Sequence, residues 1–120
     1  SVSQNEILRR SVLVTGFPYN IAANPESALE KFAALTKSAR GIRRLGSAAI
    51  DMCYVAKGVF DGFWELFLHP WDICAGILLV EEAGGVVTDF NGNKIDIYSK
   101  RILATNGKVH QGIIDIMNLF

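Results

Sequence analysis

Apolar residues occur along the chain in two alternating arrangements, short runs bounded by glycine or asparagine and longer stretches with helical spacing. Short runs rich in β-branched residues predict strands, and apolar positions three and four residues apart predict helices. The predicted strands cover residues 11–16, 41–45, 63–65, 86–90, 94–97 and 102–105. The predicted helices cover residues 25–40, 47–59, 70–83 and 109–120. This alternation predicts an α/β fold with a mixed, mostly parallel sheet flanked by helices, in which a hairpin at Asn91–Gly92 supplies the antiparallel element.

The predicted helix that starts at Pro70 is unusual because residues 73–80 contain no polar side chain. Proline suits the first helical position, and Gly84–Gly85 suits the end, where a left-handed residue is common. A helix that is apolar on every side is expected to be buried. The carboxylates of Glu65 and Asp72 flank its start, so each needs a hydrogen-bond donor, a cation or a metal as a partner.

These two carboxylates and the nearby His69 also have ordinary structural interpretations. Asp72 falls in the first turn of the predicted helix, where the helix dipole favours negative charge. Glu65 can be a surface residue at the end of a strand. His69 is more often a structural histidine than a catalyst. Local pattern alone favours these readings over a metal or catalytic site.

A second junction between strand and helix lies at Gly46, Ser47 and Ala48. Glycine lets a ligand approach the backbone, and the free N–H groups of a helix start suit an oxygen-rich ligand. The spacing from Gly41 to Ser47 imitates a nucleotide-binding P-loop, but the lysine of that motif is missing, which argues against nucleoside triphosphates. Local pattern favours an ordinary turn in which Ser47 caps the helix.

Composition narrows the class of protein. The chain has 120 residues, half of them hydrophobic, with 12 basic and 12 acidic side chains and no formal net charge. One domain is the natural expectation, and neither a nucleic-acid surface nor a membrane helix is expected. Cys53 and Cys74 lie in apolar helical patterns, so we expect them to be core residues of a reduced, cytoplasmic protein. The start at Ser1, without methionine or a signal pattern, fits a piece of a longer chain.

Three motifs, in order, resemble the inositol monophosphatase family. They are Gly41-Ile42-Arg43-Arg44-Leu45-Gly46-Ser47-Ala48-Ala49, Asp61-Gly62-Phe63-Trp64-Glu65, and the segment from Trp71-Asp72 to Gly84-Gly85. The resemblance covers the whole chain but only the second half of such an enzyme. It implies the C-terminal domain of that family's layered α-β-α-β-α sandwich, without the N-terminal half that binds most of the metal.

The resemblance also implies roles for individual residues. Asp72 would bind Mg²⁺ and lie near the phosphate ester, and Glu65 would bind hydroxyl groups of an inositol phosphate or related sugar or polyol phosphate. Gly46, Ser47 and Ala48 would bind the same substrate, and His69 would help hold Asp72. Arg43 and Arg44 are expected at the solvated surface rather than facing phosphate. No residue of this half is expected to be catalytic by itself.

The implied reaction is Mg²⁺-dependent hydrolysis of a phosphate monoester by a homodimer. The family's Asp-Pro-x-Asp-Gly-Thr motif, which holds further metal bonds, is absent from these 120 residues. We therefore expect the chain alone to be inactive. The alternative is a non-catalytic dimerisation or protein-binding module that uses the same half-fold.

Overall fold

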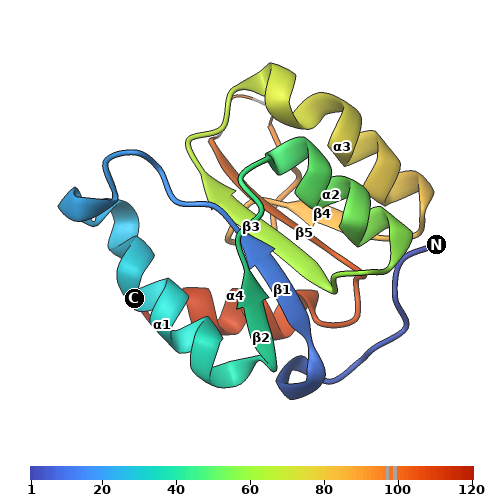
Figure 1. Ribbon diagram of the computed structural model, residues 1–120, viewed down its shortest axis with the longest axis horizontal. Helices are drawn as coiled ribbons and strands as arrows, with labels where there is room; N and C mark the ends of the chain where they lie inside the picture. Colours follow the sequence, from blue (N-terminus) through green and yellow to red (C-terminus); the bar gives the residue numbers. More distant parts are fainter. Residues whose placement is uncertain (97, 99) are drawn as a thin grey trace.

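A computed structural model describes residues 1–96, 98 and 100–120 and shows one five-stranded sheet of order β2-β1-β3-β5-β4 (Figure 1). The strands are β1 (Val12–Thr15), β2 (Gly41–Arg43), β3 (Gly62–Leu66), β4 (Val86–Thr88) and β5 (Arg101–Thr105). β1 pairs in parallel with β2 and β3, whereas β5 pairs antiparallel with β3 and β4. The sheet is mixed, as predicted, but its antiparallel part is as large as its parallel part.

Helices cover both faces of this sheet (Figure 1). α2 (Ala48–Lys57) and α3 (Pro70–Glu82) lie side by side on one face, and α1 (Ala28–Ser38) and α4 (His110–Met117) lie on the other. Successive side chains along each strand point to opposite faces of the sheet, so the strands contribute to two hydrophobic cores. Leu13 packs with the core beneath α1 and α4, and its neighbour Val14 packs with the core beneath α2 and α3.

Two predicted elements differ from the structure. The helix predicted from Pro25 begins at Ala28, because Glu26 and Ser27 take left-handed conformations with φ of 52° and 58°, which an α-helix cannot include. The strand predicted over residues 94–97 is reduced among the described residues to one bridge between Thr88 and Lys94, and Ile97 lies outside them. The antiparallel element therefore comes from β5 rather than from the Asn91–Gly92 turn.

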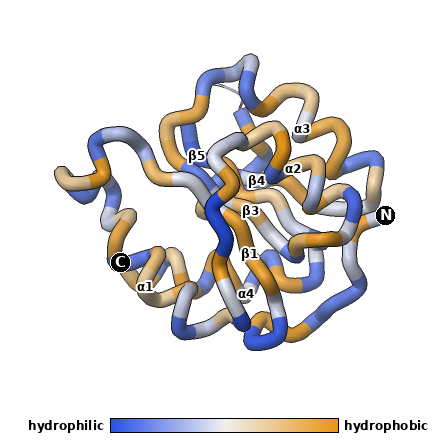
Figure 2. Tube along the Cα trace, in the orientation of Figure 1, coloured by the Kyte–Doolittle hydropathy of each residue, from blue (hydrophilic) through white to orange (hydrophobic). Residues whose placement is uncertain are grey.

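The prediction that α3 is buried on every side is wrong. Trp71 is 75% exposed and Leu78 is 60% exposed, and much of α3 is hydrophobic (Figure 2). Cys53 and Cys74 are exposed free thiols rather than core residues. The reason is geometric: one side of α3 covers the sheet and α2, and its other side has no covering element in the described chain.

α2 and α3 approach each other closely at one glycine. A Cβ atom at Gly76 would lie 2.5 Å from Met52 Sδ, so the contact requires a residue without a side chain.

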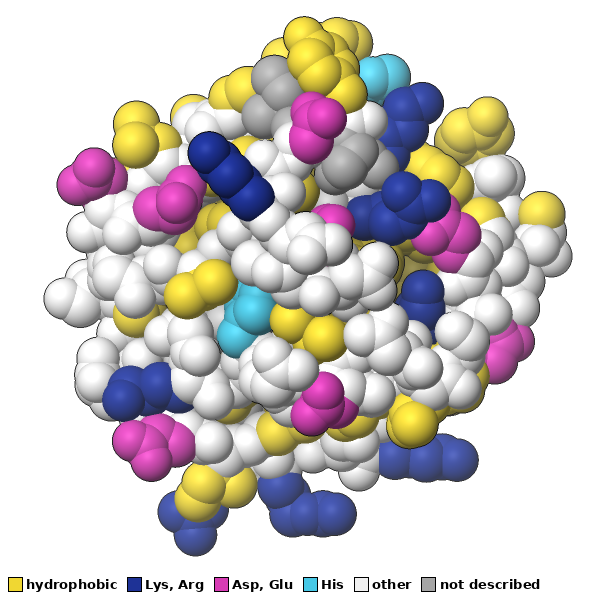
Figure 3. Space-filling model, turned by 180° about the vertical axis from the view of Figure 1, so that it is seen from behind, with side chains coloured by type: hydrophobic (Ala, Val, Ile, Leu, Met, Phe, Trp, Pro, Cys, Tyr) yellow, Lys and Arg dark blue, Asp and Glu magenta, His cyan; other side chains and the backbone are white. Residues whose placement is uncertain are grey.

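On the face seen from behind in Figure 3, basic and acidic side chains are interspersed. No helix within the described residues is long and apolar enough to cross a membrane.

Candidate functional site

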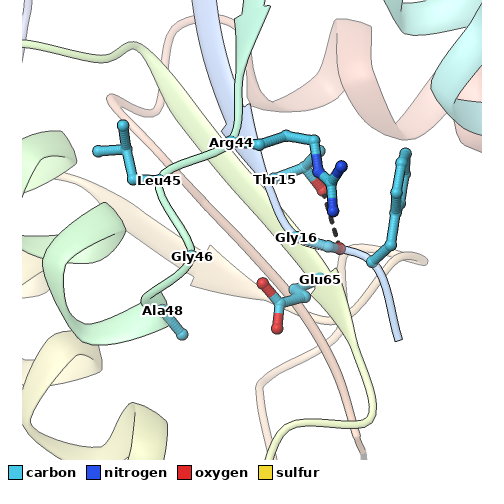
Figure 4. Close-up of a pocket in the computed structure, with 8 residues that line it drawn as sticks. Thr15, Gly16, Arg44, Leu45, Gly46, Ala48 and Glu65 are labelled. Atoms are coloured by element: carbon cyan, nitrogen blue, oxygen red, sulfur yellow. Dashed lines mark hydrogen bonds between the residues drawn. The ribbon is translucent and has the colours of Figure 1, made fainter. Parts of the chain in front are cut away.

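A cavity of about 340 Å³ opens where β1 and β2 end and α2 begins (Figure 4). In open α/β sheets ligands bind beyond the carboxyl ends of the parallel strands, which is where this cavity lies. The residues that line it come from the ends of β1 and β3 and from the segment that joins β2 to α2. They are Thr15, Gly16, Phe17, Arg44, Leu45, Gly46, Ala48 and Glu65.

Glu65 is the acidic residue of this lining. Its carboxylate lies so close to Gly16 that a side chain at Gly16 would collide with Oε1. The Thr15 hydroxyl donates a 2.6 Å hydrogen bond to the Trp64 carbonyl, which fixes the end of β1 against β3. Gly16 and Thr15 thus position Glu65 at the cavity, and the resemblance of the three motifs had not identified either of them.

The surroundings of Glu65 favour its protonated form. Burial, and after it the negative charges of Asp51 and Asp72, raise the pKa of Glu65 to about 7, although the positive charge of Arg44 opposes the shift. Near neutral pH this carboxyl group exists in both forms. It can therefore accept a hydrogen bond from a ligand hydroxyl when ionised and donate one when protonated.

The residues of the second predicted site, Gly46, Ser47 and Ala48, have two different roles. Gly46 has φ of +85° and no atom near its missing side chain, so its backbone faces open space, and it lines the cavity together with Ala48. Ser47 is the N-cap of α2, and its Oγ accepts a 3.3 Å hydrogen bond from the Ile50 N–H. This hydrogen bond confirms the capping role that local pattern predicted for Ser47. Ser47 is not part of the cavity lining.

Asp72 lies in the first turn of α3, and its Oδ2 accepts a 3.3 Å hydrogen bond from the His69 N–H. Its structural role at the helix start is therefore confirmed. Asp72 does not line the cavity, although its charge reaches Glu65. The His69 ring stacks on Trp71 at 4.3 Å between ring centres, and His69 and Asp72 form a reciprocal capping box at the start of α3.

The donor set for a metal is incomplete within this chain. Among the described residues no group of three or more His, Cys, Asp or Glu side chains is placed to hold a metal ion. Mg²⁺ takes carboxylate oxygens and usually keeps several waters. Asp72 offers such oxygens at an accessible helix start, so it fits the role of one ligand but does not form a site alone.

Two residues near the cavity were not expected there. Arg44 is exposed, as predicted, but it also lines the cavity, with its guanidinium carbon 4.4 Å from the centre of the Phe17 ring. Asp51 is 1% exposed, its Oδ1 has no hydrogen-bond partner, and burial raises its pKa to about 6. Helical spacing gave a signal for Asp51, because it shares the buried face of α2 with Met52 and Val55.

The three motifs and the cavity at the strand ends agree with a comparison of the whole chain to known families. The model of the inositol monophosphatase family matches residues 1–118. The chain belongs to this family.

Several members of the inositol monophosphatase family are similar over nearly the whole chain. An inositol-1-monophosphatase of Synechocystis is 47% identical over 110 residues, which are 92% of this chain and 38% of that protein. The chloroplastic phosphatase IMPL1 of Arabidopsis thaliana is 42% identical over 95% of this chain and 31% of its own length. The structure of an inositol monophosphatase from Anabaena superposes with a TM-score of 0.90 at 42% identity, covering 98% of this chain and 47% of that one.

The chain thus spans less than half the length of these relatives. The family and the fold predicted from the motifs are confirmed. The roles predicted for Glu65, Asp72, Gly46, Ser47 and Ala48 stay predictions.

Proposed function

We propose that this chain is the substrate-recognition part of a Mg²⁺-dependent phosphatase that hydrolyses an inositol phosphate or a related sugar or polyol phosphate. The observation that carries the proposal is the position of Glu65. A half-buried carboxyl group with a pKa of about 7 lines a cavity of about 340 Å³ at the strand ends, beside the exposed backbone of Gly46. Such a carboxyl group suits hydroxyl groups, because it can accept or donate hydrogen bonds.

Different residues would bind different parts of the substrate. Glu65 would orient the polyol, and the backbone from Gly46 to Ala48 would contact it at the start of α2. Asp72 would hold the phosphate end by contributing a carboxylate ligand to Mg²⁺. When bound, the metal polarises the phosphoryl oxygens and activates the attacking water. The remaining ligands would come from a segment outside these 120 residues, so we propose that this chain alone releases no phosphate.

The test uses the intact polypeptide expressed from its reading frame, with phosphate release measured in Mg²⁺ and in EDTA. Glu65→Gln should raise the KM for inositol 1-phosphate by about tenfold or more, since an oriented charged hydrogen bond is lost. It should change the KM for p-nitrophenyl phosphate, which has no hydroxyl groups to orient, by less than about twofold. The exposed Glu81→Gln is the matched control.

Two results would contradict the proposal. One is the absence of Mg²⁺-dependent phosphate release from inositol and sugar phosphates. The other is an equal loss of both activities in Glu65→Gln, which would mean that Glu65 does not recognise the polyol.

A second candidate function is a non-catalytic dimerisation or protein-binding module. It is favoured by the large apolar side chains that α2 and α3 expose, among them Ile50, Trp71 and Leu78. The family also includes proteins named for another role, such as the Nus factor SuhB of Escherichia coli, which is 40% identical over 87% of this chain. Stable self-association together with an inactive intact polypeptide would favour the module over the enzyme.

A further inference from the structure

The cavity is lined by an arginine and a glutamate that do not form an ion pair with each other. Arg44 and Glu65 both line it, yet no acidic side chain among the described residues lies within ion-pair distance of Arg44. The Glu65 carboxylate points toward the segment from Gly46 to Ala48, whereas the Arg44 side chain extends over Gly16 (Figure 4). The space between the two groups is therefore open to a ligand that has a neutral and an anionic part.

Arg44 is exposed to solvent, and its guanidinium group lies over an aromatic ring. Its guanidinium carbon lies 4.4 Å from the centre of the Phe17 ring, a distance typical of a cation–π contact. Phe17 is itself packed edge-on against Phe32 of α1, with 4.9 Å between ring centres and an interplanar angle of 74°. This contact lowers the entropy cost of binding an anion at Arg44, because it restricts the side chain before the anion binds.

We infer that Arg44 is a specificity-determining residue that binds a second anionic group, a phosphate or a carboxylate, on the polyol phosphate recognised by Glu65. This inference rests on the proposed function and narrows its substrate class. Guanidinium groups bind phosphate and carboxylate through paired hydrogen bonds. Glu65, when ionised, repels an anion from its own end of the cavity, so the two residues together fix the orientation of the ligand.

The second anion is distinct from the reacting phosphate. Asp72, the residue expected near the reacting phosphate, does not line the cavity, whereas Arg44 does. The charges of both residues act on Glu65, which is therefore the residue that the two ends have in common. A ligand held in this way has its hydroxyl groups at Glu65, the reacting phosphate toward Asp72 and the second anion at Arg44.

The test compares binding of three probes to the intact polypeptide by calorimetry at constant ionic strength, with Ca²⁺ supplied in place of Mg²⁺ as a cation for the reacting phosphate. The probes are inositol 1-phosphate, inositol 1,4-bisphosphate and glucuronic acid 1-phosphate. The two probes with a second anion should bind about tenfold or more tightly than inositol 1-phosphate. Arg44→Ala should abolish this preference, so that the three probes bind with equal affinity.

Matched variants separate a specific contact from general attraction between charges. Arg43→Ala removes a neighbouring exposed arginine that does not line the cavity and should keep the preference. Arg44→Lys keeps the charge without the paired donors and should keep only part of it. A gain for the bisphosphate alone would identify phosphate as the second anion, and a gain for both probes would identify anions in general.

Equal affinity of the unsubstituted polypeptide for all three probes, or the same loss in Arg43→Ala and Arg44→Ala, would overturn the inference. Phosphate release with Mg²⁺ tests the proposed function separately. A polypeptide that hydrolyses inositol 1-phosphate but shows no preference dependent on Arg44 would retain the function and lose the inference. An inactive polypeptide that still prefers the probes with a second anion would contradict the proposed function and support the inference.

Discussion

The Oε1 atom of Glu65 occupies the space that a side chain at Gly16 would fill. The two residues come from adjacent parallel strands, and Thr15 and Trp64, which precede them, are paired in the register of β1 and β3. The orientation of the cavity's carboxyl group therefore depends on the absence of a side chain one residue beyond the paired end of β1.

Gly16→Ala should displace Glu65 and weaken substrate binding. Gly16 does not have a positive φ, so alanine is compatible with its backbone, and the damage should be confined to the cavity. We expect the KM for inositol 1-phosphate of the intact polypeptide to rise about tenfold or more, since a misplaced partner loses most of a charged hydrogen bond. Steady-state kinetics and thermal unfolding of the same variant measure the two effects.

Gly112→Ala is the control for this substitution. Gly112 lies within α4, and a Cβ atom there would meet Leu8 at an ordinary 3.8 Å. Alanine should stabilise that helix by about 0.5–1 kcal/mol and leave the KM unchanged. An unchanged KM in Gly16→Ala would show that Glu65 does not bind the substrate in the orientation seen here.

His110 links β4 to β5 from a buried position, and its hydrogen bonds define one tautomer. The Thr88 hydroxyl donates to the Asp89 carbonyl at 2.7 Å, so it accepts from His110 Nε2–H, also at 2.7 Å. Nδ1 then accepts from the Thr105 hydroxyl at 2.8 Å. Nitrogen NMR should show a neutral ring protonated at Nε2 above about pH 5, since burial lowers the pKa of His110 to about 4.

The same pKa sets the direction of an acid effect on stability. The unfolded chain takes up the proton near pH 6.5 and the folded chain only near 4, so this contribution to stability is complete above 6.5 and falls as the pH falls toward 4. Thr105→Val should cost about 1–3 kcal/mol, because it leaves Nδ1 without a donor. Urea unfolding measures this cost, and Thr36→Val, at an exposed position, should cost much less.

Local pattern was sufficient to predict most of the fold. β1, α2, α3 and β5 follow from apolar spacing, from Pro70 at the start of α3 and from the serine cap of α2, and all of these signals act within a few residues. The start of α1 was misplaced because Glu26 and Ser27 adopt left-handed conformations, which no local sequence signal indicates. The exposure of α3 was also missed, because an apolar sequence shows that a helix needs a cover but not whether the same chain supplies it.

The cavity was only partly predictable for a different reason. Glu65, Gly46 and Ala48 stand within the motifs that carry the family resemblance. Gly16 stands outside the motifs, and Arg44 stands within one but was expected at the solvated surface; both reach the cavity only after β1, β2 and β3 have paired. Their contribution depends on the register of strands far apart in the sequence, which the pattern of a single segment does not contain.

The apolar side chains exposed on α2 and α3 should make the chain of 120 residues associate with itself. Leu78 is 60% exposed and Leu79 is 46% exposed on α3. Replacing both with glutamate should lower the mass-average molecular weight in sedimentation equilibrium and change the free energy of unfolding by less than about 0.5 kcal/mol. Leu119→Glu is the control, because Leu119 is 74% exposed beyond the end of α4. Persistent association of the double variant would place the contact elsewhere.

Asp51 should destabilise the folded chain at neutral and alkaline pH, because its buried carboxylate has no partner for Oδ1. Burial raises its pKa from 3.8 to about 6, so the folded state holds the proton more tightly than the unfolded state. This contribution to stability is complete below pH 3.8 and is lost as the pH rises through 6. Asp51→Asn should therefore raise the free energy of unfolding at pH 8 by about 1–3 kcal/mol and have little effect near pH 4. Urea unfolding at both pH values measures the difference, with the exposed Asp115→Asn as control. An equal effect of Asp51→Asn at pH 4 and pH 8 would mean that the buried charge is not its cause.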